Sequence, residues 1–537
     1  MGATAGLPLC EGPVIFRDKK DLQWALIVSI LILLLGSIPT WAGYLLETPD
    51  LRFRGLYYDQ QDYAVHIAMM RAGAHGEWAY QFRFTTEPHS PAYVRMFYIL
   101  LGKLNAWTGF EPEITFQLMR LLLGLAALLS LYFLMRKVFQ TIFWARTAFL
   151  LAAAGSGLGW LQLIFNWTST RITPIDFWLI DDYVFFSLSV FPHFAFVTAG
   201  MCIALTLWLA YLEKPLWSYI AWISCLSILV QFINPIAFAT VDAGLAGATI
   251  FHWWKMGKVQ LAEISALALI AIAQTPLLAY NFIVLNNDPL WSQFTIQNQT
   301  LSPPVDYYLW GFGLFWPFAI YGAISAFQEK SPSMGAAVFW IAAGFALAYL
   351  PVGIQRRFLQ NITIPLAILS AGGLIKLFET GRVPSQRWRR WQKILVILLI
   401  FLTSISSIQL SLGRTIHLQT QPEEFYYPVS IDQAAQWFSE HAQYNDFVLA
   451  SERTSQIIAQ RASMRVYLGH EMETLAYKTK QGNVQAFFEG RMPAIASAPI
   501  KWVIYGPIER GLSTDFHPPN NLELVFFSQE MQIYKVK

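Results

Sequence analysis

The chain has 537 residues, of which 55% are hydrophobic and only 13% are charged, and its mean hydropathy is +0.41. Such a composition leaves too few polar side chains to cover a soluble protein of this length, so we predict a polytopic α-helical membrane protein. The 21 tryptophans fit the aromatic belts at membrane interfaces, and membrane lipids are therefore expected partners. A net charge of only +3 gives no basic surface for nucleic acid, and no nucleic-acid partner is expected.

Apolar segments long enough to cross a bilayer core of about 30 Å recur along the chain. The first, residues 24–46, has no small-residue cleavage site after it, so we interpret it as an anchor and not as a signal peptide. A further segment, 93–107, is short and carries Arg95 and Lys103, which favours a re-entrant or interface-lying helix. We predict about 11 spans, or 12–13 helices if such short ones are counted, at residues 24–46, 115–135, 145–165, 185–211, 217–234, 236–253, 260–281, 307–327, 335–352, 359–378 and 393–413.

The basic residues of the short loops predict the orientation. With eleven spans, the loops "RKVFQTIFWAR", "KMGK", "QEK" and "RVPSQRWRRWQK" all fall on the side of the N-terminus, which is therefore expected to be cytoplasmic. We predict a transmembrane domain over residues 1–415, with exterior loops 47–90 and 166–183, and an extracytoplasmic domain over 416–537. In that last domain "DFVLAS", "RVYLGH", "KWVIYGP" and "LELVFFS" are typical of short strands and "DQAAQWFSEHA" is typical of a helix, which indicates a small α/β fold.

The first exterior loop contains "LYYDQQDYAVH", residues 56–66. Asp59, Asp62 and His66 are spaced by three and four residues, so a helix would place them on one face. Ionisable groups close to an apolar boundary are costly unless they are paired or used, which suggests a functional site. A solvated loop with helix caps is the competing interpretation, and spacing alone does not decide between the two.

The second exterior loop carries another acidic pair, Asp181 and Asp182, and His193 follows in "VFPHF". Carboxylate oxygens suit a hard divalent cation, and they equally suit the hydroxyl groups of an acceptor; Asp182 could also be a helix cap. Histidine inside an apolar helix is more often a hydrogen-bonded packing residue than a catalyst, whereas the acidic neighbours of His66 leave a packing role and a functional role equally open. No zinc spacing, phosphate loop or serine-hydrolase elbow is present.

Several segments, in order, resemble the GT-C superfamily of polytopic glycosyltransferases. "GEWAYQFRFTTEPHSPAYVRMFYILLGKL" is similar to the stretch that follows the first-loop acid in that superfamily, and "TPIDFWLIDDYVFFSLSVFPHFAF" resembles the acid-bearing second loop of a family 39-like subgroup. "LMRLLLGLAALLSLYFLMRKVF" resembles its second span, and "GIQRRFLQNITIPLAILSA" the basic stretch near the end of its membrane domain. The tail "ERTSQIIAQRASMRVYLGHEMET" is similar to its extracytoplasmic domain, so the resemblance covers most of the chain.

This resemblance implies that the protein takes a sugar from a polyprenyl-phosphate lipid and passes it to an acceptor hydroxyl of a glycan, lipid or protein, at the outer face of the plasma membrane. Asp59 or Asp62 would be the general base of an inverting transfer. Arg356 and Arg357 would bind the phosphate, because a guanidinium can fork onto its oxygens; interfacial snorkelling is the alternative. His66, Asp181, Asp182 and His193 would contact substrates. The two acidic loops are expected to line one cavity, and a divalent cation there stays open.

Two other function classes compete with the transferase. A transporter or flippase for a lipid-linked saccharide could use the exterior carboxylates to bind sugar hydroxyls without bond breaking, but such folds often have paired halves with matching helix breaks. "QFINPIAF" is one such break and no second half repeats it. A noncatalytic membrane scaffold would leave both acidic loops unexplained.

Overall fold

A computed structural model describes residues 19–165, 173–379, 386–492 and 498–537. The chain forms two compact units. Unit 1 comprises the described residues of the segments up to 38, 119–280 and 300–413. Unit 2 comprises those of 39–118, 281–299 and 414–537. Four long helices pass from one unit into the other: α1 (Lys19–Leu45), α4 (Pro112–Val138), α11 (Leu261–Asn287) and α17 (Gln386–Leu418).

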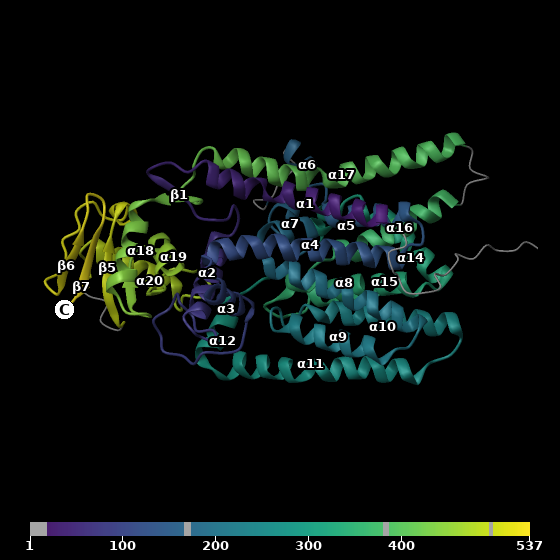
Figure 1. Cartoon of the computed structure of the whole chain (residues 1–537), viewed down its shortest axis with the longest axis horizontal. Coiled ribbons are helices and arrows are strands. Elements are labelled where there is room, and N and C mark those ends of the chain that lie inside the picture. The colour runs from purple at the N-terminus through teal and green to yellow at the C-terminus, as the bar shows by residue number, and fades with distance from the viewer. Residues whose placement is uncertain (1–18, 166–172, 380–385, 493–497) are drawn as a thin grey trace, which may run out of the picture. The chain divides into compact units, whose positions relative to one another are not determined.

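Unit 1 is helical, and its long helices run roughly parallel to one another (Figure 1). Helix α14 packs along α16, and α10 packs along α15. Besides the greater part of the four long helices, the unit contains α5 (Ile142–Ala154), α6 (Gly159–Ile164), η1 (Ile175–Phe177), α7 (Val184–Val190), α8 (Pro192–Glu213), α9 (Trp217–Gln231), α10 (Phe238–Met256), α13 (Val305–Phe312), α14 (Phe315–Glu329), α15 (Pro332–Ala348), η2 (Gln355–Leu359) and α16 (Thr363–Glu379).

The described residues contain five helices that are long and apolar enough to cross a membrane, or six if the bent pair α13–α14 is one span. These five are α1, α4, α8, α11 and the 390–418 part of α17. Each of the eleven predicted spans contains a helix, although α5, α9 and α15 are shorter apolar helices of 13 to 17 residues. The prediction of a polytopic helical membrane protein is confirmed, whereas the number of spans stays a prediction.

Three predicted spans are interrupted, and a glycine or a proline lies at each of the breaks. Helix α5 ends at Ala154, and "GSG" leads into α6; a Cβ on Gly157 would lie 2.0 Å from the carbonyl oxygen of Gly311, so this glycine permits close backbone packing. Pro192 begins α8 directly after α7, where a proline costs no helical hydrogen bond. Helices α13 and α14 meet at 90°.

Unit 2 joins the first loop to the C-terminal segment of the chain. Strand β1 (Leu51–Phe53) pairs antiparallel with β2 (Tyr426–Pro428). Helix α2 (Gln60–Ala74) packs on α3 (Phe97–Thr108) and on α19 (Glu452–Ala462). The remaining elements are α12 (Pro289–Gln297), α18 (Ser430–His441), β3 (Phe447–Leu449), β4 (Arg465–Val466), α20 (Tyr477–Phe488), β5 (Ile500–Tyr505), α21 (Pro507–Arg510), β6 (Leu522–Phe527) and β7 (Gln532–Val536).

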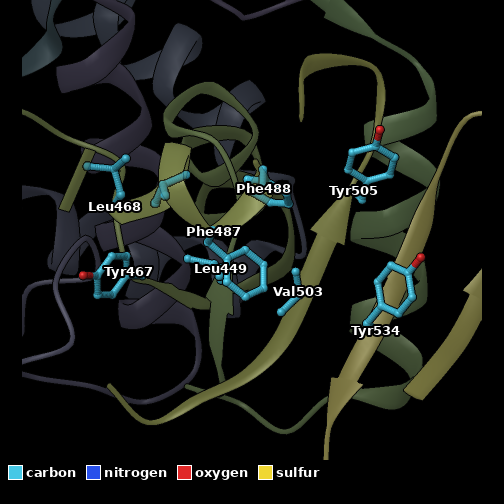
Figure 2. Close-up of a cluster of buried hydrophobic side chains, with 9 residues drawn as sticks. Leu449, Tyr467, Leu468, Phe487, Phe488, Val503, Tyr505 and Tyr534 are labelled. Carbon is cyan, nitrogen blue, oxygen red and sulfur yellow. The ribbon is translucent and has the colours of Figure 1, made fainter. Parts of the chain in front are cut away.

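The C-terminal segment contains the predicted α/β fold. Its five-stranded sheet has the order β4-β3-β5-β7-β6, in which β3 pairs in parallel with β4 and β5, while β7 is antiparallel to β5 and β6. The four predicted strands and the predicted helix are present as β3, β4, β5, β6 and α18, and β7 is an additional strand. Figure 2 shows part of the core, where Phe487 and Phe488 of α20 lie with Leu449 of β3 and Val503 of β5.

Candidate active site at the start of helix α2

Helix α2 begins within the acidic stretch that the sequence singled out. Asp59 is its N-cap, and the Asp59 Oδ1 accepts the backbone N–H of Asp62 at 3.2 Å. Asp59 has φ +50°, a left-handed conformation that aspartate and asparagine adopt more often than most other non-glycine residues. Both carboxylates are partly exposed, and the side chain of Asp62 keeps 33% of its accessible surface. The capping interpretation is therefore right for Asp59, while Asp62 presents a carboxylate to solvent one turn later.

Asp62 has a partner 408 residues away in the sequence. The Nε2 of His470, in the loop after β4, lies 3.0 Å from the Asp62 Oδ1. The Nδ1 of the same ring accepts the backbone N–H groups of Met472 and Glu473 at 3.0 and 3.1 Å. Because two donors require a lone pair on Nδ1, the ring proton belongs on Nε2, and His470 donates it to Asp62.

A second charged group, Arg95, belongs to the same cluster. Arg95 lies two residues before α3 and has φ +57°. Its Nη1 forms an ion pair with the Oε1 of Glu473 at 2.7 Å. The other oxygen of that carboxylate accepts the hydroxyl of Tyr80 at 2.5 Å. Segment 470–474 thus bonds to α2, to Tyr80 and to Arg95 ahead of α3, and it joins three parts of unit 2.

The surroundings keep Asp62 ionised. Burial would raise the pKa of the Asp62 carboxyl, but the hydrogen bond from His470 and the positive field of neighbouring groups including Arg95 hold this pKa well below its usual range. Asp62 is therefore a carboxylate throughout the physiological pH range. In the described part of the chain, no hydrogen bond uses its Oδ2 atom.

His66 lies one turn after Asp62 on the same helix and is buried. Its ring stacks on the ring of Tyr98 of α3, with centroids 3.9 Å apart and an interplanar angle of 14°. His66 also contributes to the lowered pKa of Asp62. The structure thus brings Asp59, Asp62 and His66 together as predicted, but the stacking makes His66 part of the α2–α3 contact.

The second acidic pair lies in unit 1, where it meets the predicted basic stretch. The backbone carbonyl of Asp181 accepts the N–H of Asn361 at 2.8 Å, and that of Asp182 accepts the Thr363 Oγ1 hydroxyl at 3.3 Å. The Asp182 side chain is fully buried, and neither carboxyl oxygen has a hydrogen-bond partner among the described residues. Burial, together with the neighbouring Asp181, raises the pKa of Asp182 well above its usual range, and Arg356 opposes this shift.

Arg356 and Arg357 lie in η2, next to this loop. The Cζ of Arg356 is 5.2 Å from the centroid of the Trp178 ring, a cation–π contact. Among the described residues, neither arginine has a carboxylate within ion-pair distance. Half-buried guanidinium groups without an anionic partner favour an anionic ligand.

His193 lies in the first turn of α8 and packs its ring against Phe191 and Phe194, with centroids 5.5 and 4.1 Å away. The described residues hold no group of three or more His, Cys, Asp or Glu side chains that could bind a metal ion. The hypothesis that the two acidic clusters line one cavity concerns two separate units and stays a prediction.

Sequence reasoning missed His470, Glu473 and Tyr80. The residues 465–470 were interpreted as a strand, but β4 ends at Val466 and the rest is a loop that reaches α2. A single sequence contains no signal that relates residue 470 to residue 62. Only covariation among homologues could have indicated this contact.

No protein-family model and no curated protein matches the sequence. Among solved structures, the Archaeoglobus fulgidus oligosaccharyltransferase AglB, in complex with an inhibitory peptide and a dolichol-phosphate, is similar with a TM-score of 0.52 at 13% identity, over 91% of this chain and 70% of that chain. ArnT from Cupriavidus metallidurans, bound to undecaprenyl phosphate, has a TM-score of 0.51 at 13% identity, over 96% of this chain and 98% of that chain. The chain therefore shares the fold of AglB and ArnT, which agrees with the polytopic helical fold expected from its resemblance to the GT-C superfamily.

Proposed function

We propose that this protein is a membrane glycosyltransferase that moves a sugar from a polyprenyl-phosphate donor to an acceptor hydroxyl, with inversion at the sugar C1. The observation that carries the proposal is the Asp62 carboxylate at the start of α2, which is one-third exposed, accepts a hydrogen bond from His470 and has its pKa lowered by cationic groups including Arg95. The GT-C fold supports it, since dolichol-phosphate and undecaprenyl phosphate are bound in the structures of AglB and ArnT.

Asp62 is the base in this mechanism. The acceptor hydroxyl binds the carboxylate, and its oxygen attacks C1 while the bond from C1 to the phosphate oxygen breaks. The hydroxyl proton passes to Asp62, and polyprenyl phosphate leaves with the bonding electron pair. A carboxylate with a lowered pKa is a weak base, so proton transfer occurs late, when the attacking oxygen has become acidic. Asp59 is the less suitable base, because its Oδ1 already accepts the Asp62 N–H.

Positive charge compensates the leaving phosphate. Arg356 and Arg357 are suited to this role, because they have no carboxylate partner among the described residues and a guanidinium binds phosphate through two parallel hydrogen bonds. We assign the exterior loops, the C-terminal segment and the reaction to the outer face of the plasma membrane, on the basis of the basic loops on the opposite side. The acceptor is a glycan, a lipid or a protein.

The test uses the purified protein in proteoliposomes with radiolabelled polyprenyl-phosphate sugars and candidate acceptors. Transfer by the wild type, its loss in Asp62→Asn by about 100-fold or more, and a smaller loss in Asp59→Asn are expected. Melting temperatures of all three proteins control for folding. Equal turnover by Asp62→Asn would refute the base assignment, and movement of intact donor lipid across the bilayer without transfer would identify a flippase.

A further inference from the structure

Asp62 does not hold its own position. The Asp62 Oδ1 lies 3.0 Å from the Nε2 of His470, which fixes the carboxylate on one side. The contact with Asp59 involves the backbone N–H of Asp62 and leaves its carboxylate unconstrained. His470 is itself buried, with 6% of its surface exposed. A buried donor on a partly exposed carboxylate leaves the second oxygen for solvent or substrate, which is the arrangement expected of a positioned base.

The ring of His470 is oriented by its own loop. The N–H groups of Met472 and Glu473 both donate to Nδ1, so the ring can neither flip nor change tautomer without losing two hydrogen bonds. The loop is in turn attached at several points: the Glu471 N–H donates to the Gln61 Oε1 at 3.1 Å, and the Thr474 hydroxyl donates to the carbonyl of Phe84 at 2.7 Å. These bonds place the ring relative to α2 independently of Asp62.

We infer that His470 is a positioning residue for Asp62: its Nε2–H fixes the orientation of the catalytic carboxylate and keeps Oδ2 directed to the acceptor hydroxyl. This inference rests on the proposed function. His470 acts through Asp62 and does not contact the reacting atoms. The charged and titratable groups that act on Asp62 are His66, Arg95 and His470, and those that act on His470 are Asp59, Asp62 and Glu473.

Two substitutions at position 470 separate the hydrogen bond from the mere presence of a side chain. His470→Gln has an amide N–H that can reach the place of Nε2–H, whereas His470→Phe keeps the ring volume and has no donor. The control is His517→Phe, because His517 forms a surface pair with Asp515 at 3.4 Å in which both side chains are more than 80% exposed.

We expect His470→Phe to lower kcat for sugar transfer by about 10- to 100-fold with little change in KM, and His470→Gln to recover most of kcat. A pH profile gives a readout that a purely structural role would not change. In His470→Phe the hydrogen bond that lowers the pKa of Asp62 is lost, so the effect of burial raises this pKa. The kcat of His470→Phe should therefore fall as the pH is lowered from about 7 to 4.5, whereas the kcat of His470→Gln should depend less on pH. His517→Phe should behave as the wild type.

A substrate-free measurement distinguishes this inference from the proposed function. The melting temperatures of wild type, Asp62→Asn, His470→Phe and the double variant form a cycle, and contact predicts that the two losses do not add. If no protein transfers sugar but the cycle is non-additive, the proposed function fails and the contact stands. If the wild type transfers sugar and His470→Phe matches it in kcat and pH profile, or if His470→Gln is as impaired as His470→Phe, the positioning role is wrong.

Discussion

The contact between α2 and α3 can be tested by one methyl group. Helix α2 carries Asp62, and α3 crosses it where Gly73 and Gly102 face each other. A Cβ on Gly102 would lie 2.0 Å from the carbonyl oxygen of Met70 and 2.8 Å from the Cα of Gly73. Both are backbone atoms, so no side-chain rotation can relieve the clash. The substitution Gly102→Ala therefore has to separate the two helices.

The size of the effect follows from these distances. The Cβ falls about 1.4 Å short of the 3.4 Å at which ordinary contact begins, and overpacking of this kind costs about 1 to 3 kcal/mol. The gain in helix propensity from Gly to Ala, about 1 kcal/mol, offsets only part of this cost. We expect Gly102→Ala to lower the melting temperature of the detergent-solubilised protein and, because α2 shifts, to reduce sugar transfer as well.

Gly482→Ala is the matched control. Gly482 lies in α20 of the same unit, and a Cβ there would meet nothing within 4 Å, so this variant should be slightly more stable than the wild type. Gly73 lies at the same crossing, and a Cβ added there would lie 2.2 Å from the carbonyl oxygen of Ile99. The losses of stability caused by Gly73→Ala and Gly102→Ala should therefore not add in the double variant. If the melting temperature of Gly102→Ala equals or exceeds that of the wild type, the backbones of α2 and α3 are not in contact at this position.

Two further predictions concern buried carboxyl groups. The carboxylate of Glu509 accepts the N–H groups of Ser451 at 2.9 Å and of Gly506 at 3.1 Å. Glu509→Ala leaves these two buried donors unpaired and should lower the free energy of unfolding by about 2 kcal/mol or more. Thermal unfolding measures this loss, and an unchanged melting temperature would contradict it. The pKa of Asp182 is raised in the folded protein by burial, whereas in the unfolded chain this carboxyl releases its proton above about pH 4, so stability is lost as the pH rises. Asp182→Asn removes this loss, so the variant should be more stable than the wild type at about pH 8 but not at about pH 4. If the melting temperatures of the two proteins change in parallel with pH, Asp182 is ionised in the folded protein.

The helical fold could be predicted from the sequence because its cause is local. Runs of apolar side chains must form helices in a membrane, where backbone groups have no water to bind, and each predicted segment does contain a helix. The bend of 90° between α13 and α14 could not be predicted, since the segment 307–327 is continuously apolar on both sides of Gly313. Strand β7 was missed because "QIYKV" is short and gains its stability from β5 and β6, which precede it in the chain.

In the candidate site, too, only the residues that are related by local spacing could be predicted from the sequence. Asp59, Asp62 and His66 are joined by helical spacing, which a sequence shows directly. The pair Asp181 and Asp182 was found by its composition, but that one of the two would be fully buried depends on packing against the segment 361–363. His470 comes from the far end of the chain, and no periodicity relates it to α2.

These long-range contacts bear on how the C-terminal segment is to be understood. Arg54, next to β1, is buried, and its guanidinium donates to the Gln456 Oε1 at 2.5 Å and to the carbonyl of Glu424 at 3.2 Å. Without residues 416–537, this cation would keep neither of these two acceptors, β1 would lose its partner strand, and Asp62 would lose His470. An unpaired buried charge is strongly destabilising. The C-terminal segment therefore stabilises the first loop, and the position of the Asp62 carboxylate at the start of α2 depends on the last quarter of the chain.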